Sequence, residues 1–179
     1  HAGIVSKWSG EILRALGKSE DRIRLAEIAG YLHDIGNCIN RKDHAQSGAI
    51  LSYKILTRLG MSAPDAAEIM MAIGNHDEQY GQPVSDVSSA LIIADKADVH
   101  KSRVKNAVSD VFKANIHDRV NLAAERSFVQ VEEGGTVIAL HIEIDTAICS
   151  VMDYFEIFLN RMILCRKAAE KLGLQFKLM

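Results

Sequence analysis

The sequence predicts a mainly α-helical protein that ends in a small α+β unit. Through the first two-thirds of the chain, apolar residues recur at i, i+3, i+4 and i+7, which is the spacing of amphipathic helices. The breaks in this pattern fall at glycine, asparagine and proline, which commonly end helices. After about residue 126 the pattern changes to short segments rich in β-branched residues, which favour strands.

The first part of the chain is expected to form a helical bundle. Gly36-Asn37 suits the end of its second helix, and Pro64 suits the first turn of the fourth, where a backbone N–H is not needed. The predicted helices span residues 2–17, 20–36, 43–60, 63–75 and 86–114, with a shorter helix near 117–126.

The last third of the chain predicts a ββαβ unit. Two β-branched segments, 127–131 and 137–142, flank Glu132-Glu133-Gly134-Gly135-Thr136, which is a hairpin signal. A long helix near 146–172 follows, and residues 174–178 then alternate like a third strand. We therefore divide the chain into a helical domain, 1–115, and an α+β extension, 116–179. Because the chain begins at His1 without a start methionine, further residues are expected upstream.

Composition excludes several classes of protein. The hydrophobic share of 48% and the charged share of 25% are those of an ordinary globular protein with one substantial core. A net charge of −2 gives no field that would attract a nucleic acid duplex or an anionic membrane. The longest apolar stretch, 144–164, is interrupted by charged residues and predicts an amphipathic helix rather than a membrane span.

The cysteines favour a reducing compartment. There are three of them, Cys38, Cys149 and Cys165, and none has CxxC spacing. An odd number without paired spacing indicates free thiols rather than a disulfide framework, so a cytoplasmic location is expected.

Several polar side chains lie on helix faces that ought to be buried. Burial of an unpaired imidazole or carboxylate is costly, so these positions need compensation. Each residue alone could be a hydrogen-bonded core residue. Together they supply four imidazoles and two carboxylates from five helices, a mixed N and O set that favours Zn, Mn or Fe over Ca or Mg. These positions are His1, the His33-Asp34 doublet, His44, His76 and Asp95.

This ordered set resembles the HD superfamily over roughly residues 1–105. The leading histidine is matched by His1, the name-giving doublet by His33-Asp34, and the closing aspartate by Asp95 in Ala94-Asp95-Lys96-Ala97-Asp98. His44 and His76 look like the extra histidines of members with two metal ions, including the HD-GYP phosphodiesterases. The resemblance implies an HD-type helical bundle and a divalent transition-metal centre, with two ions of Mn, Fe, Zn or Ni.

The resemblance also implies roles for these residues. One ion is assigned to His1, His33, Asp34 and Asp95, and the other to Asp34, His44 and His76, with Asp77 as an outer ligand. Asp34 is then the bridge between two cations that activate a water for attack on phosphorus. The catalytic set is Asp34, Lys96 and Glu78, the last of which would orient a ligand or water. Phosphate capture is assigned to Arg41, Lys42 and Lys96, and Lys101 and Arg103 beyond Asp95 are further candidates.

The favoured function is hydrolysis of a phosphate ester, either a nucleotide or another small phosphorylated metabolite. HD-GYP proteins have His-His-Glu and a longer Gly-Tyr-Pro loop, whereas this chain has His76-Asp77-Glu78 and a shortened stretch that ends at Pro83. Because of this difference, cyclic-dinucleotide hydrolysis is kept only as an alternative to the favoured function. Two further alternatives are di-iron oxygenase chemistry and a non-catalytic signalling or scaffold domain. The extension is expected to mediate self-association or partner binding, and a homodimer through residues 127–179 is one form this could take.

Overall fold

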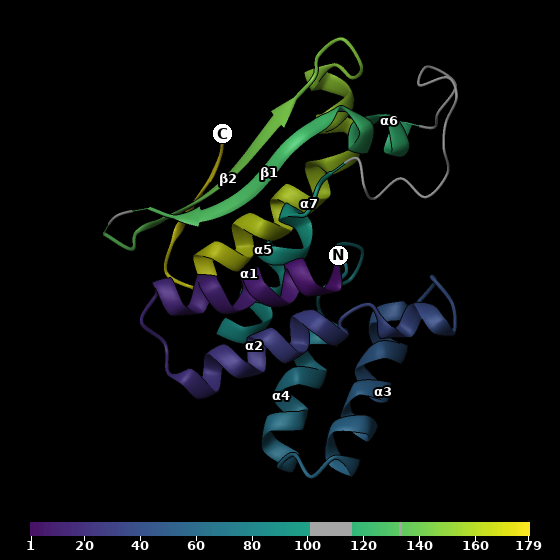
Figure 1. The fold of residues 1–179 in the computed structure, drawn as a ribbon, viewed down its shortest axis with the longest axis vertical. Helices are drawn as coiled ribbons and strands as arrows, with labels where there is room; N and C mark the ends of the chain where they lie inside the picture. The colour runs from purple at the N-terminus through teal and green to yellow at the C-terminus, as the bar shows by residue number, and fades with distance from the viewer. Residues whose placement is uncertain (101–115, 133) are drawn as a thin grey trace.

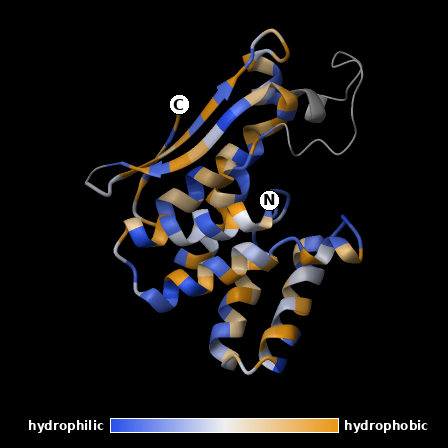
Figure 2. Ribbon diagram, in the orientation of Figure 1, coloured by the Kyte–Doolittle hydropathy of each residue, from blue (hydrophilic) through white to orange (hydrophobic). Residues whose placement is uncertain are grey.

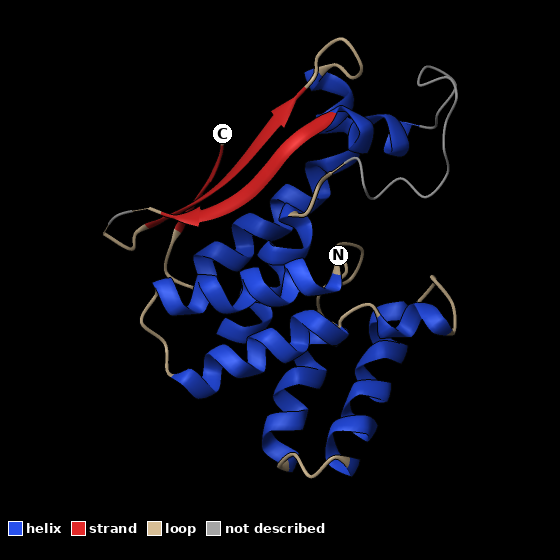
Figure 3. Cartoon of the chain, in the orientation of Figure 1, coloured by secondary structure: helices blue, strands red, loops and turns tan. Residues whose placement is uncertain are grey.

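The structure is a computed structural model that describes residues 1–100, 116–132 and 134–179. Its helices lie in a layered bundle, with a three-stranded sheet along one side (Figures 1 and 3). The elements in chain order are α1 (Ala2–Ala15), α2 (Glu20–Leu32), the 3-10 helix η1 (Ile35–Cys38), α3 (His44–Arg58), α4 (Ala63–Gly74), α5 (Asp86–Ala97), α6 (Ile116–Ala123), β1 (Ala124–Val131), β2 (Val137–Ile144), α7 (Val151–Lys171) and β3 (Gln175–Leu178). The predicted mainly helical fold with a ββαβ unit is confirmed.

Serine side chains fix where several helices begin. Ser19, Ser62, Ser85 and Ser150 precede α2, α4, α5 and α7, and each hydroxyl accepts a hydrogen bond from a backbone N–H in the first turn. These caps satisfy N–H groups that have no partner within the helix. At α7, Asp153 also returns a bond to the Ser150 backbone and completes a capping box.

Several predicted boundaries were wrong. The last helix begins at Val151 rather than at residue 146, because Ser150 caps it. The second helix ends at Leu32 rather than at residue 36, because the chain turns through η1 after His33. The predicted 86–114 helix ends at Ala97, and its continuation from 101 lies outside the described residues. The short helix ends at Ala123, and β1 begins at once with Ala124, where strand pairing with Ile144 takes over. Helical spacing does not show where such long-range pairing interrupts a helix.

Helix α5 forms the centre of the molecule. Its residues Val87, Leu91, Ile92 and Ile93 have no exposed surface, and it packs against α1, α2, α4 and α7. A helix that is apolar all round must be enclosed on every side. Asp95 and Lys96, near its C-terminal end, are therefore carried into the interior by the surrounding packing.

Small residues on α2, namely Ala26, Ala29 and Gly30, let α1 and α2 lie close together. A Cβ at Gly30 would come within 2.7 Å of the Cα of Ser6 on α1. Ala26 and Ala29 are fully buried in the same region. This close approach brings His1, before α1, to the end of α2, where His33 lies.

The sheet has the order β1-β2-β3, with β1 and β2 antiparallel and β2 and β3 parallel. Apolar and polar residues mix along β1 and β2 in Figure 2, and Ile138, Ala139 and Leu140 of β2 are fully buried. Ile138 and Leu140 join the same hydrophobic core as Leu91 of α5. The extension thus shares its core with the helical bundle, and the division at residue 115 stays a prediction.

Helix α7 connects the sheet to the bundle, because it packs on both α5 and β3. It also carries exposed apolar residues, of which Met152, Phe155 and Leu159 lie at i, i+3 and i+7. Self-association through residues 127–179 stays a prediction. None of the helices within the described residues combines the length and apolar character that crossing a membrane requires.

Candidate metal centre

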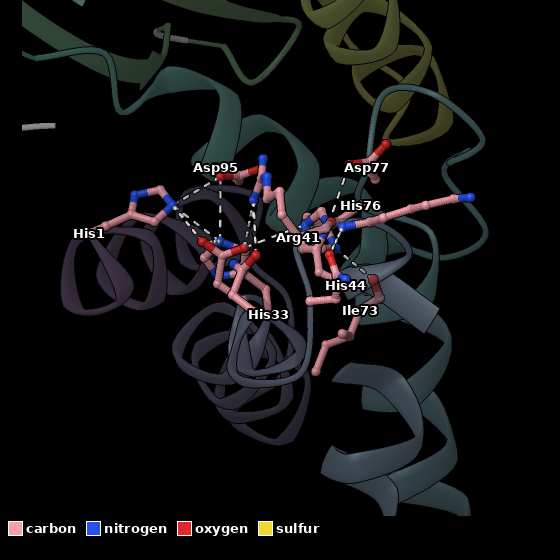
Figure 4. Close-up of polar contacts among 12 residues, drawn as sticks. His1, His33, Arg41, His44, Ile73, His76, Asp77 and Asp95 are labelled. Carbon is pink, nitrogen blue, oxygen red and sulfur yellow. Dashed lines mark hydrogen bonds and ion pairs between the residues drawn. The ribbon is translucent and has the colours of Figure 1, made fainter. Parts of the chain in front are cut away.

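The predicted ligands meet at one place although they come from separate helices (Figure 4). His1 immediately precedes α1, His33 immediately follows α2, and Asp34 immediately precedes η1. His44 is the first residue of α3, His76 lies two residues after the end of α4, and Asp95 lies near the end of α5. Helix ends therefore converge on this site, and the packing of the bundle positions its side chains.

Two glycines bring the His33-Asp34 turn against α3. A Cβ at Gly36 would overlap the carbonyl oxygen of His44 and lie 2.7 Å from the backbone nitrogen of Gly48. A Cβ at Gly48 would in turn lie 3.1 Å from the backbone nitrogen of Gly36. The absence of side chains at both positions allows His44 to reach the same centre as Asp34.

Backbone carbonyls orient three of the four imidazoles. The Nδ1 atoms of His33, His44 and His76 lie 2.8, 3.0 and 2.6 Å from the carbonyl oxygens of Gly30, Arg41 and Ile73. A carbonyl can only accept, so each Nδ1 carries a proton, and the neutral form of each ring has its lone pair at Nε2. Carbonyl partners of this kind fix the tautomer of metal-binding histidines.

The Nε2 atoms then face one another at short range. His44 Nε2 lies 3.2 Å from His76 Nε2, and His1 Nε2 lies 3.1 Å from His33 Nε2. Burial lowers the pKa of His76 to about 4, so its ring is neutral at neutral pH. Two lone pairs that face each other in this way repel unless a cation or a shared proton lies between them. This donor set fits a bound metal.

Asp34 lies between two pairs of histidines. Its Oδ2 is 3.7 Å from His33 Nε2 and 3.9 Å from His1 Nε2, whereas its Oδ1 is 3.5 Å from His44 Nε2. The two oxygens of one carboxylate therefore face different imidazole pairs, His1 with His33 and His44 with His76. This is the geometry that a bridging carboxylate requires.

Asp95 completes the group around His1 and His33. Its Oδ1 lies 3.1 Å from His1 Nε2 and 3.4 Å from His33 Nε2. Burial raises the pKa of Asp95, but the charge of Lys96 and the adjacent imidazoles of His1 and His33 outweigh it and hold the pKa well below the usual range. Asp95 is thus a carboxylate. His1, His33 and Asp95, and likewise His33, Asp34 and His76, each place three ligand atoms close enough together to hold an ion.

The model of the HD domain family matches residues 1–103, more than half of the 179 residues. The chain belongs to the HD domain family. That family consists mostly of metal-dependent phosphohydrolases, and it also has non-catalytic members. No curated protein matches this chain. The HD match contains every predicted ligand and ends before α6, the sheet and α7.

Asp77 lies beside the six predicted metal-binding residues of the HD pattern (the HD ligands), but on the far side of the His44 ring. The HD ligands are His1, His33, Asp34, His44, His76 and Asp95. Its Oδ2 is 3.8 Å from Nδ1 of His44, whereas the other ligand atoms gather at the Nε2 side. Its assignment as an outer ligand stays a prediction. Asp98, which the sequence interpretation did not assign, lies 2.7 Å from Nδ1 of His1. A signal was present, because Asp98 follows Asp95 by three residues, a spacing that places two side chains on one side of a helix.

Lys96 and Glu78 form an ion pair next to the HD ligands. The Nζ of Lys96 lies 2.7 Å from Glu78 and 2.7 Å from Asp95. Burial alone would lower the pKa of Lys96, but the two carboxylates outweigh it and raise the pKa. Burial raises the pKa of Glu78, but Lys96 and Arg161 outweigh it and lower the pKa to about 2. All of these groups are charged at neutral pH, and two of the three donors of Lys96 are engaged.

Two adjoining cavities open beside the HD ligands. The inner one, of about 150 Å³, is lined by Asp34, Asp95, His44 and His76, and also by Asn121, Phe158 and Arg161 from the extension. The outer one, of about 310 Å³, is lined by Lys42, Asp77, Glu78 and Tyr80. Arg41 and His44 border both cavities.

The basic residues assigned to phosphate differ in position. Arg41 is exposed, and its guanidinium lies 3.5 Å from Asp34 at the opening. Lys42 faces only the outer cavity, and Lys96 faces the inner one. Lys101 and Arg103 lie outside the described residues. Arg161, which the sequence interpretation missed, comes from α7 and donates to Glu78 at 3.0 Å. No spacing in the sequence links residues that are 83 positions apart.

Proposed function

We propose that this HD domain protein hydrolyses a phosphate ester, a nucleotide or another small phosphorylated metabolite, with two divalent transition-metal ions. The proposal rests on the position of Asp34. Its two carboxylate oxygens face separate imidazole pairs, at 3.5 to 3.9 Å from the Nε2 atoms of His1, His33 and His44. Two ions held there would activate a water for attack on phosphorus and neutralise charge on the phosphoryl oxygens.

The residues of the chain supply the arrangement for this chemistry. His1, His33 and Asp95 would hold one ion and His44 and His76 the other, with Asp34 shared between them. The fixed tautomers keep the Nε2 lone pairs directed inward without any rearrangement. No nucleophile from the protein is needed, because such a pair of ions can direct a water in line with the leaving group.

The substrate is expected to be small. The inner cavity of about 150 Å³ is below the roughly 300–1,000 Å³ of pockets that enclose a whole drug-sized ligand. A phosphoryl group and its ions would occupy the inner cavity, with the organic part in the outer one. The outer cavity has Tyr80 as its only aromatic lining residue among the described residues, so it offers no platform for two guanines. The free cysteines Cys38, Cys149 and Cys165 support a cytoplasmic location.

The test is metal analysis followed by a substrate panel. Protein loaded with Mn, Fe, Zn or Ni would be assayed on nucleotide monophosphates, sugar phosphates and cyclic di-GMP, with Asp34→Ala as the control. We expect a small ester to be hydrolysed with a higher kcat/KM than cyclic di-GMP. Higher turnover of cyclic di-GMP would support the phosphodiesterase alternative. Oxygen consumption by the iron-loaded protein without ester hydrolysis would support the oxygenase alternative, and metal binding without turnover of any substrate would support a scaffold role.

A further inference from the structure

The extension contributes part of the wall of the inner cavity. Asn121 of α6 and Phe158 and Arg161 of α7 line it opposite the HD ligands. The HD match ends at residue 103, so these three residues belong to the part of the chain that the family pattern does not describe. One wall of the proposed catalytic site is therefore formed by residues outside the HD match.

Arg161 is held rigidly in that wall. Its Nε donates to Oε1 of Glu78 at 3.0 Å, and its guanidinium carbon lies 4.7 Å from the centre of the Phe158 ring. Phe158 is only 1% exposed and stacks on Tyr154, so the surface under the guanidinium is fixed. A guanidinium supported by an aromatic face and a carboxylate loses little freedom when it binds an anion.

The terminal nitrogens of Arg161 remain available for a ligand. Within the described residues, Glu78 is the only side chain that makes a hydrogen bond or ion pair with this arginine, and it uses Nε. The two terminal nitrogens form a planar fork that matches two oxygens of a phosphate.

The other cations near the inner cavity are less suited to this role. Lys96 is clamped between Glu78 and Asp95, at 2.7 Å from each. The side chain of Arg41 is 68% exposed, whereas that of Arg161 is 28% exposed. Arg161 combines partial burial, fixed orientation and unused donors, which neither of the other two does.

We propose that Arg161 binds the phosphoryl group of the substrate and makes the site selective for phosphate monoesters. This inference rests on the proposed function. A monoester carries about −1.5 to −2 charges at pH 7 and presents three free oxygens, enough for the Arg161 fork and for two metal ions. A diester has one charge and two substituted oxygens, so it loses part of that contact and needs space on both sides of phosphorus.

The test compares Arg161→Ala and Arg161→Lys with Arg166→Ala. Arg166 is on the same helix but exposed, and it pairs only with Glu170 among the described residues. Binding of inorganic phosphate to the Mn-loaded protein would be measured by calorimetry, with metal content and melting temperature as checks. We expect Arg161→Ala to weaken phosphate binding about 10-fold or more, because a hydrogen-bonded charge pair is lost. Arg161→Lys should be intermediate because it keeps the charge without the fork, and Arg166→Ala should match the wild type.

Turnover gives a second readout. Arg161→Ala should lose more kcat/KM on p-nitrophenyl phosphate, a monoester, than on bis(p-nitrophenyl) phosphate, a diester. Unchanged phosphate binding in Arg161→Ala would overturn the inference, as would a wild type that binds no phosphate. Loss of metal in both Arg161 variants would make the arginine structural and also overturn it. If phosphate binding depends on Arg161 but no ester is hydrolysed, the proposed function and the monoester selectivity fail, while the phosphate-binding role of Arg161 stands.

Discussion

The carboxylate of Asp98 lies 2.7 Å from Nδ1 of His1, on the opposite side of the ring from the Nε2 that faces His33. His33, His44 and His76 have backbone carbonyls at the equivalent place, so among these four rings His1 alone has a carboxylate within hydrogen-bonding distance of Nδ1. A carboxylate behind a metal-binding imidazole fixes its tautomer and raises its basicity. Asp98 thus takes, behind the His1 ring, the place that a backbone carbonyl takes behind the other three rings.

Asp98→Ala should therefore weaken metal binding about 10- to 100-fold, as loss of such partners does in other metal sites. Asp98→Asn should weaken it less, because the amide oxygen still accepts from Nδ1. Competition with a chelating dye measures the affinity. Asp21→Ala, at an exposed aspartate far from the cavity, is the control. Wild-type affinity in Asp98→Ala would mean that His1 needs no such support.

The wild type should carry close to two transition-metal ions per chain, because a site for one ion built from His1, His33, Asp34 and Asp95 would leave His44 and His76 unused. His76→Ala should keep one ion and lose most activity, whereas Asp34→Ala should lose both, since Asp34 faces both imidazole pairs. Elemental analysis of protein purified without chelators tests this. A content that never exceeds one ion, even after reconstitution with Mn or Fe, would contradict the two-ion proposal.

The helices and the residues that meet at the site could be predicted because both produce patterns in the local sequence. Apolar spacing shows which helix face is buried, and histidines on such a face need a partner. The burial of His33, His44 and His76 agrees with that reasoning. No local sequence pattern distinguishes Arg161 from a solvated surface arginine. An arginine on an amphipathic helix is normally solvated, and its contact with Glu78 exists only because α7 packs on α5.

The predicted boundaries failed for a related reason. Ala123 and Ala124 are both compatible with a helix, and the strand starts there because Ala124 pairs with Ile144 across the sheet. Asp98 is an intermediate case. Its spacing from Asp95 was readable, but its partner His1 is 97 positions away, and no pattern in the sequence indicates that contact.

Gly36→Ala should destabilise the fold and reduce the metal content. The added Cβ would overlap the His44 carbonyl and lie 2.7 Å from the Gly48 nitrogen, both of them backbone atoms that cannot turn aside. Overpacking of this kind costs about 1–3 kcal/mol. Gly3→Ala is the matched control, because a Cβ there has no neighbour within 4 Å and alanine favours a helix. Urea unfolding would compare the two, and equal stability would show that η1 can move away from α3.

Cys165 should make the stability depend on pH in the alkaline range. Burial raises the pKa of this thiol from 9.0 to about 12, so the folded state keeps the proton where the unfolded chain loses it. Below pH 8 the thiol is protonated in both states and contributes no pH dependence. As the pH rises above 9 the unfolded chain releases a proton and the folded chain does not, so the free energy of unfolding falls. At pH 10 the loss should reach about 1.4 kcal/mol relative to pH 8.

Urea unfolding at pH 8, 9 and 10 measures this loss in the wild type, Cys165→Ala and Cys38→Ala. Cys165→Ala should be less stable at every pH because it leaves a cavity, but its decline between pH 8 and 10 should be smaller than that of the wild type by about 1.4 kcal/mol. Cys38 is exposed, so Cys38→Ala leaves the buried thiol in place and should decline as the wild type does. Tyr154, whose pKa is also raised by burial, releases its proton at higher pH in the unfolded chain, so measurements stop at pH 10. Equal declines in the wild type and in Cys165→Ala would mean that the thiol reaches solvent in the native state and that α7 does not seal the core beneath it.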